Sequence, residues 1–378
     1  MSASRMKILL IAIALGTGCV ERAESVGPAT AVLERVSLPP GFVIELVTDQ
    51  VPNARSLTLG QDETLFVGTR NAGRVYAVTD IARGQQASVR VIADGLNMPN
   101  GVAFRDGALF VAEVNRILRY DRIEESLDAP PEPRVVTDRL PTDRHHGWKY
   151  IAFGPDGRLY VPIGAPCNVC DQEGYAVVLR MNIDGSGREV FARGVRNTVG
   201  FTWHPQTGEF WFTDNGRDWL GDDLPPCELN RADRAGLDFG FPRCHGVDVV
   251  DPEFGSAGAC TGVVPPVQSL DAHVAPLGVK FYTGSAFPAE YRNQLLIAEH
   301  GSWNRSVKSG YRLTRITLDG HQAVGYEPFA TGFANGDEVY GRPVDLLIMD
   351  DGSVLVSDDH AGAIYRISYR ADGTDEDT

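Results

Sequence analysis

The stretch Tyr150-Ile-Ala-Phe-Gly-Pro-Asp-Gly-Arg-Leu-Tyr-Val161 decides the fold, because it joins two apolar runs through a tight Pro-Asp-Gly turn. The same phrase occurs six times along the chain, and the other copies begin at Ser56, Gly101, Gly200, Gly278 and Val344. Short strands that recur at about 40–60 residues are typical of β-propeller blades. The sequence therefore predicts an all-β, six-bladed β-propeller over residues 35–370.

This repeat also indicates where a functional site should lie. Residues just before the first strand and just after the second strand share one face of the disc in every blade. Polar and ionisable residues gather at these positions: His145, His146, Arg196, Asn197, Asp214, Asn215, His273, Glu299, His300, Arg342, Asp358 and Asp359. Loops on a rigid scaffold commonly carry binding and catalysis. We therefore expect these side chains to converge around the central channel.

The N-terminus indicates an exported protein. Basic residues precede an apolar run and the sequence Gly16-Thr-Gly-Cys19, so residues 1–19 are expected to be a signal peptide. Cys19 after small residues resembles a bacterial lipobox, which leaves lipid attachment and plain cleavage both open. We expect a periplasmic or lipid-anchored protein with a flexible tether over residues 20–34. Residues 371–378 are expected to be a disordered acidic tail.

Charge and cysteine content narrow the chemistry. The net charge of −15 disfavours nucleic acid or an anionic membrane surface as a partner, leaving a lipid at Cys19 as the expected membrane contact. Export favours disulfides, and the candidates are Cys167–Cys170 and Cys244–Cys260, with Cys227 left over. A zinc site from Cys167, Cys170, Cys227 and Cys244 is the alternative, although it lacks the second close pair of typical zinc sites. Covalent haem is excluded, because Asp171 stands where attachment needs His.

The repeat breaks between the fourth and fifth blades. Residues 216–275 hold three cysteines, many prolines and the acidic run Gly221-Asp-Asp-Leu-Pro-Pro226. Such a long segment within a compact fold is uncommon unless it is functional. It leaves from and returns to the polar face, so we expect an inserted loop that serves as a lid or substrate wall.

Several motifs, in order along residues 36–370, resemble the soluble sugar dehydrogenases that depend on pyrroloquinoline quinone (PQQ), and the sorbosone dehydrogenase branch most of all. The segment from His146 to Val161 resembles the one that begins with their catalytic His, and Gly194-Val-Arg-Asn197 resembles the Arg-Asn pair beside the quinone. Phe212-Thr-Asp-Asn-Gly-Arg217 resembles their calcium loop. The remaining cofactor-binding segments resemble Gly301-Ser-Trp-Asn-Arg305, Gly341-Arg342 and Val356-Ser-Asp-Asp-His-Ala-Gly362.

The resemblance implies a role for individual residues. It implies that His146 and Arg196 are catalytic and that the backbone carbonyls of Gly216 and Arg217 hold Ca²⁺. Cofactor contacts are implied for Arg196, Asn197, Asn215, Arg305, Arg342 and Asp359, and substrate contacts for His145, Asp223 and Phe239. Glucose-type members have Asp, Pro and Tyr at the places of His145, Arg217 and Phe239. Backbone ligation of calcium does not depend on residue type, so these departures bear on sugar specificity.

The chemistry of such an enzyme asks for the same residue types. Oxidising a hydroxyl or hydrated aldehyde needs a base for the O–H proton, and a neutral His suits that role. Negative charge that develops on the quinone would be stabilised by Ca²⁺ and Arg196. The three carboxylates of PQQ suit Arg305 and Arg342. We expect a quinoprotein dehydrogenase that oxidises a small sugar or aldehyde and passes electrons to an external quinone or cytochrome.

Two other functions stay open from sequence. A calcium-dependent lactonase on the same fold would use acidic and amide side chains, for which Glu113, Asn197, Asp214 and Glu299 are available. A non-catalytic binding propeller would use the polar residues only as loop anchors or turn caps.

The ring of blades must also close. The run Gly41-Phe-Val-Ile-Glu-Leu-Val47 precedes the first full repeat. We expect it to dock on the last blade beside residues 363–367, where it would cover an open sheet edge.

Overall fold

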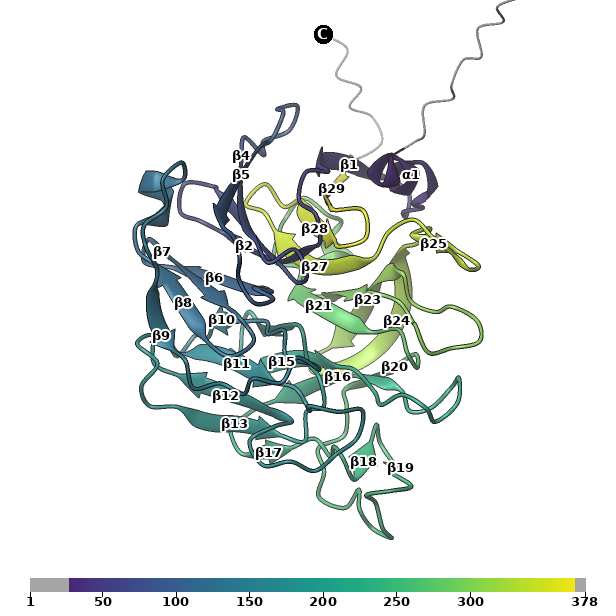
Figure 1. Ribbon diagram of the computed structural model, residues 1–378. Coiled ribbons are helices and arrows are strands. Elements are labelled where there is room, and N and C mark those ends of the chain that lie inside the picture. The colour runs from purple at the N-terminus through teal and green to yellow at the C-terminus, as the bar shows by residue number, and fades with distance from the viewer. Residues whose placement is uncertain (1–26, 371–378) are drawn as a thin grey trace, which may run out of the picture.

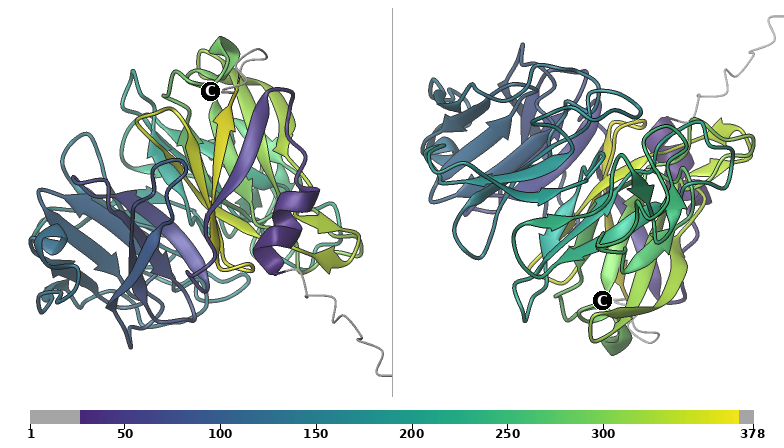
Figure 2. Two further views of the ribbon diagram at one scale, coloured as in Figure 1. Left: turned by 90° about the horizontal axis from the view of Figure 1, so that it is seen from above. Right: turned by 90° about the horizontal axis from the view of Figure 1, so that it is seen from below.

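The described part of the chain, residues 27–370 of a computed structural model, is a six-bladed β-propeller (Figures 1 and 2). Each blade is an antiparallel sheet of four successive or nearly successive strands, extended in the third blade by one parallel strand. The first strands of neighbouring blades contact one another, so they surround the centre of the disc. The fold class expected from the repeat is confirmed.

The strands are grouped blade by blade. Blade 1 contains β2 (Ala54–Leu59), β3 (Leu65–Thr69), β4 (Val75–Thr79) and β5 (Ser88–Ala93). Blade 2 contains β6 (Gly101–Arg105), β7 (Ala108–Ala112), β8 (Ile117–Tyr120) and β9 (Arg134–Thr137). Blade 3 contains β10 (Ala152–Phe153), β11 (Leu159–Ile163), β12 (Val177–Met181) and β13 (Glu189–Arg193), with β17 (Leu237–Asp238) added at its edge. Blade 4 contains β14 (Phe201–Trp203), β15 (Phe210–Asp214), β16 (Cys227–Ala232) and β20 (Gln268–Leu270). Blade 5 contains β21 (Pro276–Phe281), β22 (Leu295–Glu299), β23 (Arg312–Asp319) and β24 (Gln322–Ala330). Blade 6 contains β27 (Pro343–Ile348), β28 (Val354–Asp358), β29 (Ala363–Tyr369) and β1 (Phe42–Thr48).

Smaller elements lie between the blades. They are the 3₁₀ helices η1 (Ile123–Ser126) and η2 (Ala289–Tyr291), the hairpin of β18 (Cys244–His245) with β19 (Val249–Val250), and the hairpin of β25 (Ala334–Asn335) with β26 (Glu338–Val339). The quoted Pro-Asp-Gly turn joins β10 to β11. Gly157 has a φ of 75° there, a conformation that glycine adopts without a steric penalty.

Strand β1 closes the ring. It pairs antiparallel with β29, with Phe42 opposite Tyr369 and Ile44 opposite Ile367 (Figure 1). The Phe42 ring packs edge-on against Phe287 at a centroid distance of 4.7 Å and against Phe329 at 5.1 Å. Residues from the start of the chain therefore complete the last blade, as expected from the sequence.

The predicted insertion is only partly separate from the blades. Residues 216–275 include β16 and β20, the third and fourth strands of blade 4, so they are not a loop between complete blades. The excursion proper runs over residues 233–267. It adds β17 in parallel to β13 of blade 3, and the Cys244–Cys260 disulfide closes it.

The N-terminal region also differs from expectation. Residues 28–34, assigned to the flexible tether, belong to helix α1 (Pro28–Arg35), whose Ala29 and Val32 are buried against blades 5 and 6. The predicted signal peptide, Cys19 and the acidic tail lie outside the described residues. Within residues 27–370 no helix combines the length and the apolar character needed to cross a membrane.

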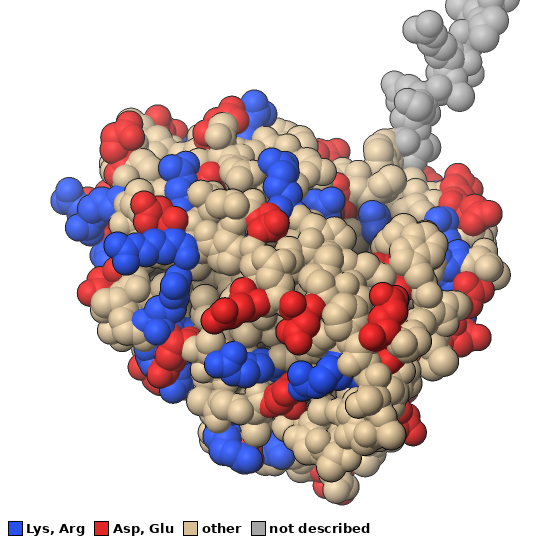
Figure 3. Space-filling model, turned by 60° about the horizontal axis from the view of Figure 1, so that its bottom comes forward, with Lys and Arg blue, Asp and Glu red and all other residues tan. Residues whose placement is uncertain are grey.

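On the face shown in Figure 3, acidic and basic side chains are interspersed and separated by uncharged residues. This face carries no continuous basic field of the kind that binds nucleic acid.

Candidate active site

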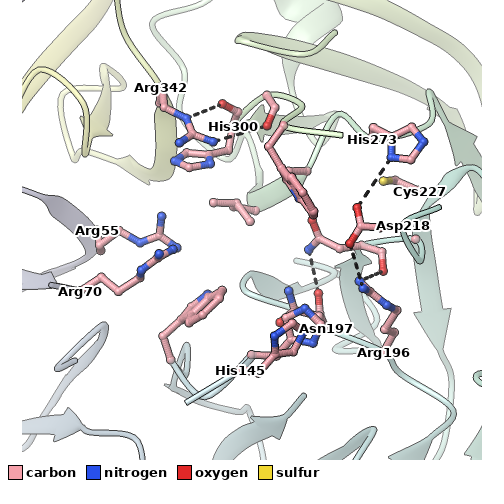
Figure 4. A pocket seen from close by; sticks show the side chains of 18 residues that line it. Arg55, Arg70, His145, Arg196, Asn197, Asp218, Cys227, His273, His300 and Arg342 are labelled. Carbon is pink, nitrogen blue, oxygen red and sulfur yellow. Dashed lines mark hydrogen bonds and ion pairs between the residues drawn. The ribbon is translucent and has the colours of Figure 1, made fainter. Parts of the chain in front are cut away.

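A cavity of about 380 Å³ lies at the centre of the disc. Its lining comes from loops between blades and from strand ends, and Figure 4 shows the side chains converging on it. Nine residues singled out from sequence line it: His145, His146, Arg196, Asn197, Asn215, Gly216, His273, His300 and Arg342. Sequence reasoning missed Arg55, Arg70 and Asp218, which also line the cavity. Three further lining residues fell in motifs quoted above without being assigned to the site: Trp148, Cys227 and Trp303.

His146 has one ring nitrogen fixed and the other available. Its Nδ1 lies 2.8 Å from the carbonyl oxygen of Ala165. A carbonyl only accepts, so Nδ1 carries the proton in the neutral ring, and Nε2 keeps its lone pair. Burial lowers the pKa of His146 well below its usual 6.5, and the positive charge of Arg196 adds to this. The backbone of Gly164 lies close against His146, because a Cβ on Gly164 would lie 2.6 Å from the Cβ of His146.

The guanidinium of Arg196 is held by the loop that follows β11. Its Nε donates to the carbonyl oxygen of Asn168 and its Nη2 to the Asn168 side-chain oxygen, both at 2.9 Å. Its Nη1 donates to the carbonyl oxygen of Asn215 at 3.2 Å, and Asp218 lies 3.4 Å away as a counter-charge. Arg196 is therefore a buried cation with a fixed orientation.

Asp214 supports the same loop from beneath. Its two carboxylate oxygens accept hydrogen bonds from the backbone N–H groups of Arg196 and Asn197, at 2.7 and 2.6 Å. Asp214 lies opposite Glu228 in the β15–β16 pair. Burial, followed by the charge of Glu228, raises the pKa of Asp214. Its contacts give it the role of an anchor for the Arg196–Asn197 backbone.

A second charged group lies on the wall formed by blades 1, 5 and 6. Asp359 accepts a hydrogen bond from Arg55 at 2.9 Å and another from His300 Nε2 at 2.8 Å. Arg55 and His300, on either side of it, hold the pKa of Asp359 far below its usual range, while burial lowers the pKa of His300 to about 4. His300 Nε2 therefore donates to the Asp359 carboxylate.

Arg342 faces the cavity with little to neutralise it. Its Nε and Nη2 reach only the carbonyl oxygens of His300 at 3.4 Å and Gly301 at 3.5 Å. Such long contacts leave donor capacity for an anionic ligand.

Several predicted residues do not reach the cavity. Arg305 and Asp223 pair with each other at 2.9 Å. Phe239 packs on Phe212 in the core at a ring distance of 4.9 Å. The excursion over residues 233–267 does not line the central cavity. The flanking parts of the predicted segment 216–275 do, and they form part of its wall through Gly216, Asp218, Cys227, His273 and Ala275.

The predicted calcium loop has a mixed geometry. The side chain of Arg217 turns away to Asp251 at 2.6 Å. Gly216 lines the cavity, and no backbone N–H from residues 27–370 donates to the carbonyl oxygens of Gly216 and Arg217. No cluster of three or more His, Cys, Asp or Glu side chains in that range could hold a metal ion.

The cysteines pair as the disulfide hypothesis expected. Cys167 bonds Cys170 and Cys244 bonds Cys260, which excludes the four-cysteine zinc site. Cys227 is the remaining thiol in the described part of the chain, and burial raises its pKa to about 12.

The residues considered for a lactonase are dispersed. Only Asn197 of the four lines the cavity. Glu113 is bonded to Arg116, and Glu299 is bonded to Arg312 and Tyr326.

Comparison with known proteins now identifies the family. The glucose/sorbosone dehydrogenase family model matches residues 112–366. The chain belongs to this family. An uncharacterised protein of Borreliella burgdorferi is 35% identical over 357 residues, which cover 90% of this chain and 93% of that protein.

Solved structures agree on the fold of this glucose/sorbosone dehydrogenase family member. The calcium structure of the Trichoderma reesei family AA12 carbohydrate-active enzyme has a TM-score of 0.78 at 20% identity, covering 89% of this chain and 97% of that one. The holo form of the PQQ domain of Coprinopsis cinerea pyranose dehydrogenase has a TM-score of 0.76 at 19% identity, covering 88% and 97%.

Proposed function

We propose that this chain is a PQQ-dependent dehydrogenase that oxidises an aldose, a sorbosone-like aldehyde or a related sugar. One observation carries the proposal: His146 presents an unprotonated Nε2 at the cavity that Arg196 and Arg342 also line. A base beside fixed positive charge is what removal of a proton and a hydride from one carbinol requires.

The lining fits an anionic quinone. PQQ is a tricarboxylate, and the cavity holds arginines whose charge the protein only partly neutralises, Arg342 among them. The carbonyl oxygens of Gly216 and Arg217 are oxygen ligands of the kind Ca²⁺ prefers. When bound, PQQ would accept hydride from the substrate carbon while Ca²⁺ polarises the accepting carbonyl.

The roles of the protein residues follow from their contacts. His146 takes the hydroxyl proton at Nε2, and its bond to Ala165 holds the ring in the required tautomer. Arg196, fixed by Asn168 and Asn215, presents positive charge where negative charge develops. Asp214 holds the backbone of Arg196 and Asn197 in place.

We further propose that the protein is exported through residues 1–19 and passes electrons to an external quinone or cytochrome. The basic residues and the apolar run before Gly16-Thr-Gly-Cys19 support the export. Mass spectrometry of the mature protein tests cleavage and lipid attachment at Cys19.

The decisive experiment reconstitutes purified protein with PQQ and Ca²⁺ and measures dye-linked oxidation of aldoses and aldehydes. Chelation followed by dialysis should abolish the activity, and Ca²⁺ with PQQ should restore it. Full activity after exhaustive chelation would overturn the calcium assignment. Lactone hydrolysis without PQQ, or no turnover with either substrate class, would replace the proposal by the lactonase or the non-catalytic propeller.

A further inference from the structure

Arg70 presents a guanidinium to the cavity without any hydrogen-bond acceptor in the described chain. It follows β3 in blade 1, and its Nε is buried and unpartnered within residues 27–370. Its guanidinium carbon lies 4.4 Å from the ring centroid of Trp148, and both residues line the cavity. Stacking on an aromatic face fixes an arginine while its N–H edge stays available. Buried donors normally have partners, and the Nε group has none within residues 27–370. The remaining N–H groups of Arg70, at the cavity, are open to a ligand.

The surrounding charges specify an anion. Figure 4 shows Arg55 and Arg70 side by side, across the cavity from Arg196, Asp218 and His273. Arg55 is paired with Asp359 and Arg196 with Asp218, whereas no salt bridge to Arg70 forms within the part of the chain that the structure describes. Burial, and then the charge of Arg55, lowers the pKa of Arg70. A guanidinium keeps its charge in such surroundings, so an incoming anion would be strongly favoured.

Arg70 belongs to a different blade from the cofactor contacts implied by the family resemblance. Those contacts that line the cavity, from Arg196 to Arg342, follow blades 3 to 5 along the chain, and none comes from blades 1 or 2. Arg70 comes from blade 1, across the cavity from Arg196, and it lies near enough to Arg342 for the charge of Arg342 to act on it. Because no implied cofactor contact comes from blade 1, Arg70 is available to an anion on the other molecule that the cavity takes.

We propose that Arg70 recognises a carboxylate on the substrate, so that this dehydrogenase prefers acidic sugars, such as uronic acids, to neutral aldoses. The inference rests on the function proposed above and names its substrate class. A carboxylate suits the fork of an arginine, which can donate two parallel hydrogen bonds. The reaction is unchanged: hydride leaves the anomeric carbon for the quinone, the hydroxyl proton goes to His146, and the sugar becomes a lactone. The carboxylate is not altered.

The binding test uses two glycosides that differ in one group. Methyl glucuronide carries a carboxylate where methyl glucoside carries CH₂OH, and neither can be oxidised at the blocked anomeric carbon. Calorimetric titration into protein reconstituted with PQQ and Ca²⁺ should give at least about 10-fold tighter binding of the glucuronide, as expected for a charge-assisted hydrogen bond. Arg70→Gln should remove this preference, and Arg70→Lys should keep part of it.

Two controls accompany the binding test. Arg74→Gln removes an arginine of the same blade whose side chain is 45% exposed and paired with Asp94, so the preference should persist. The affinity for PQQ, measured by fluorescence titration, should change less than about 3-fold in Arg70→Gln. The ratio of kcat/KM for glucuronate and glucose should follow the binding preference in each variant.

The outcomes separate this inference from the proposed function. Equal binding of the two glycosides to the wild type would overturn the carboxylate site at Arg70. A drop of more than about 10-fold in PQQ affinity in Arg70→Gln, with the glycoside preference intact, would reassign Arg70 to the cofactor. Preferential binding of the glucuronide without oxidation of any sugar would support the carboxylate site and overturn the dehydrogenase. Oxidation of neutral aldoses without a preference for acidic sugars would support the dehydrogenase and overturn the carboxylate site.

Discussion

Asn168 lies between the two cysteines of the Cys167–Cys170 disulfide, and its side-chain oxygen accepts a hydrogen bond from Arg196 at 2.9 Å. The Asn168 amide also donates to the carbonyl oxygen of Asp218 at 3.0 Å. The Cys167–Cys170 disulfide thus shapes the loop that orients the guanidinium of Arg196. Its influence on Arg196 is one of position, because neither cysteine lines the cavity.

The first prediction tests this positioning. Replacing both Cys167 and Cys170 by Ser should lower kcat by about 10-fold, because small displacements of an oriented group are costly in catalysis. Cys244→Ser with Cys260→Ser is the matched control. That pair closes a loop with a sequence separation of 16 residues outside the cavity, so it should lower stability by about 3 kcal/mol and leave kcat unchanged. Equal kcat values in the two double variants would contradict the assignment.

The second prediction concerns the base. His146→Ala should lower kcat by a factor of about 10²–10⁴, the range expected when a general base is removed, while PQQ still binds. His145→Ala is the control, because its ring packs on His146 at a centroid distance of 4.1 Å but lacks the bond to Ala165. Near-normal turnover of the His146 variant in stopped-flow assays would transfer the role to His145 or His273.

The third prediction concerns the pH dependence of the same step. Burial lowers the pKa of His146 well below 6.5, so the neutral, proton-accepting ring predominates at every pH above that lowered value. The acid limb of kcat/KM should therefore lie below pH 6.5 rather than at it. A limb centred at or above 6.5 that persists in His146→Gln would show that another group limits the reaction.

The repeat predicted the blades because turn chemistry and strand alternation are local properties. Strand β16 of blade 4 differs from this pattern in burial, because its apolar and its polar positions are both buried. Strand β16 reads Cys-Glu-Leu-Asn-Arg-Ala, and Glu228 and Asn230 are buried there because they bond each other at 2.9 Å. A sequence pattern does not show that two polar side chains bond each other inside the core, so the sequence predicts a loop where β16 lies.

The candidate site was predictable where chain direction and the resemblance agreed. His146, Arg196 and Arg342 fall at equivalent places in the repeat and reach the cavity. Arg55 and Arg70 occupy the corresponding places in blade 1, at the start of β2 and just after β3, so the same rule applied to that blade would have found them. Arg305 could not have been placed, because its partner Asp223 lies on the loop of another blade.

The fourth prediction concerns the ion pair of the cavity wall. Asp359 joins Arg55 to His300, and its lowered pKa means that its charge stabilises the fold above the unfolded value of 3.8. Asp359→Asn should cost about 3–5 kcal/mol at pH 7, because Arg55 is left buried without its partner. The difference from wild type should shrink as the pH falls below 3.8. Exposed Asp350→Asn is the control in urea unfolding, and a difference independent of pH would contradict the linkage.

The last prediction concerns the closure of the ring. Phe42 is only 9% exposed and packs against aromatic rings of blade 5, so Phe42→Ala should lower the free energy of unfolding by about 3–5 kcal/mol. Leu46 lies on the same strand with 38% exposure, and Leu46→Ala should cost less than about 1 kcal/mol. Because β1 joins the start of the chain to its last blade, the loss in Phe42→Ala should appear as one cooperative transition in urea. A separate early transition confined to blade 6 would show that the ring does not unfold as a unit.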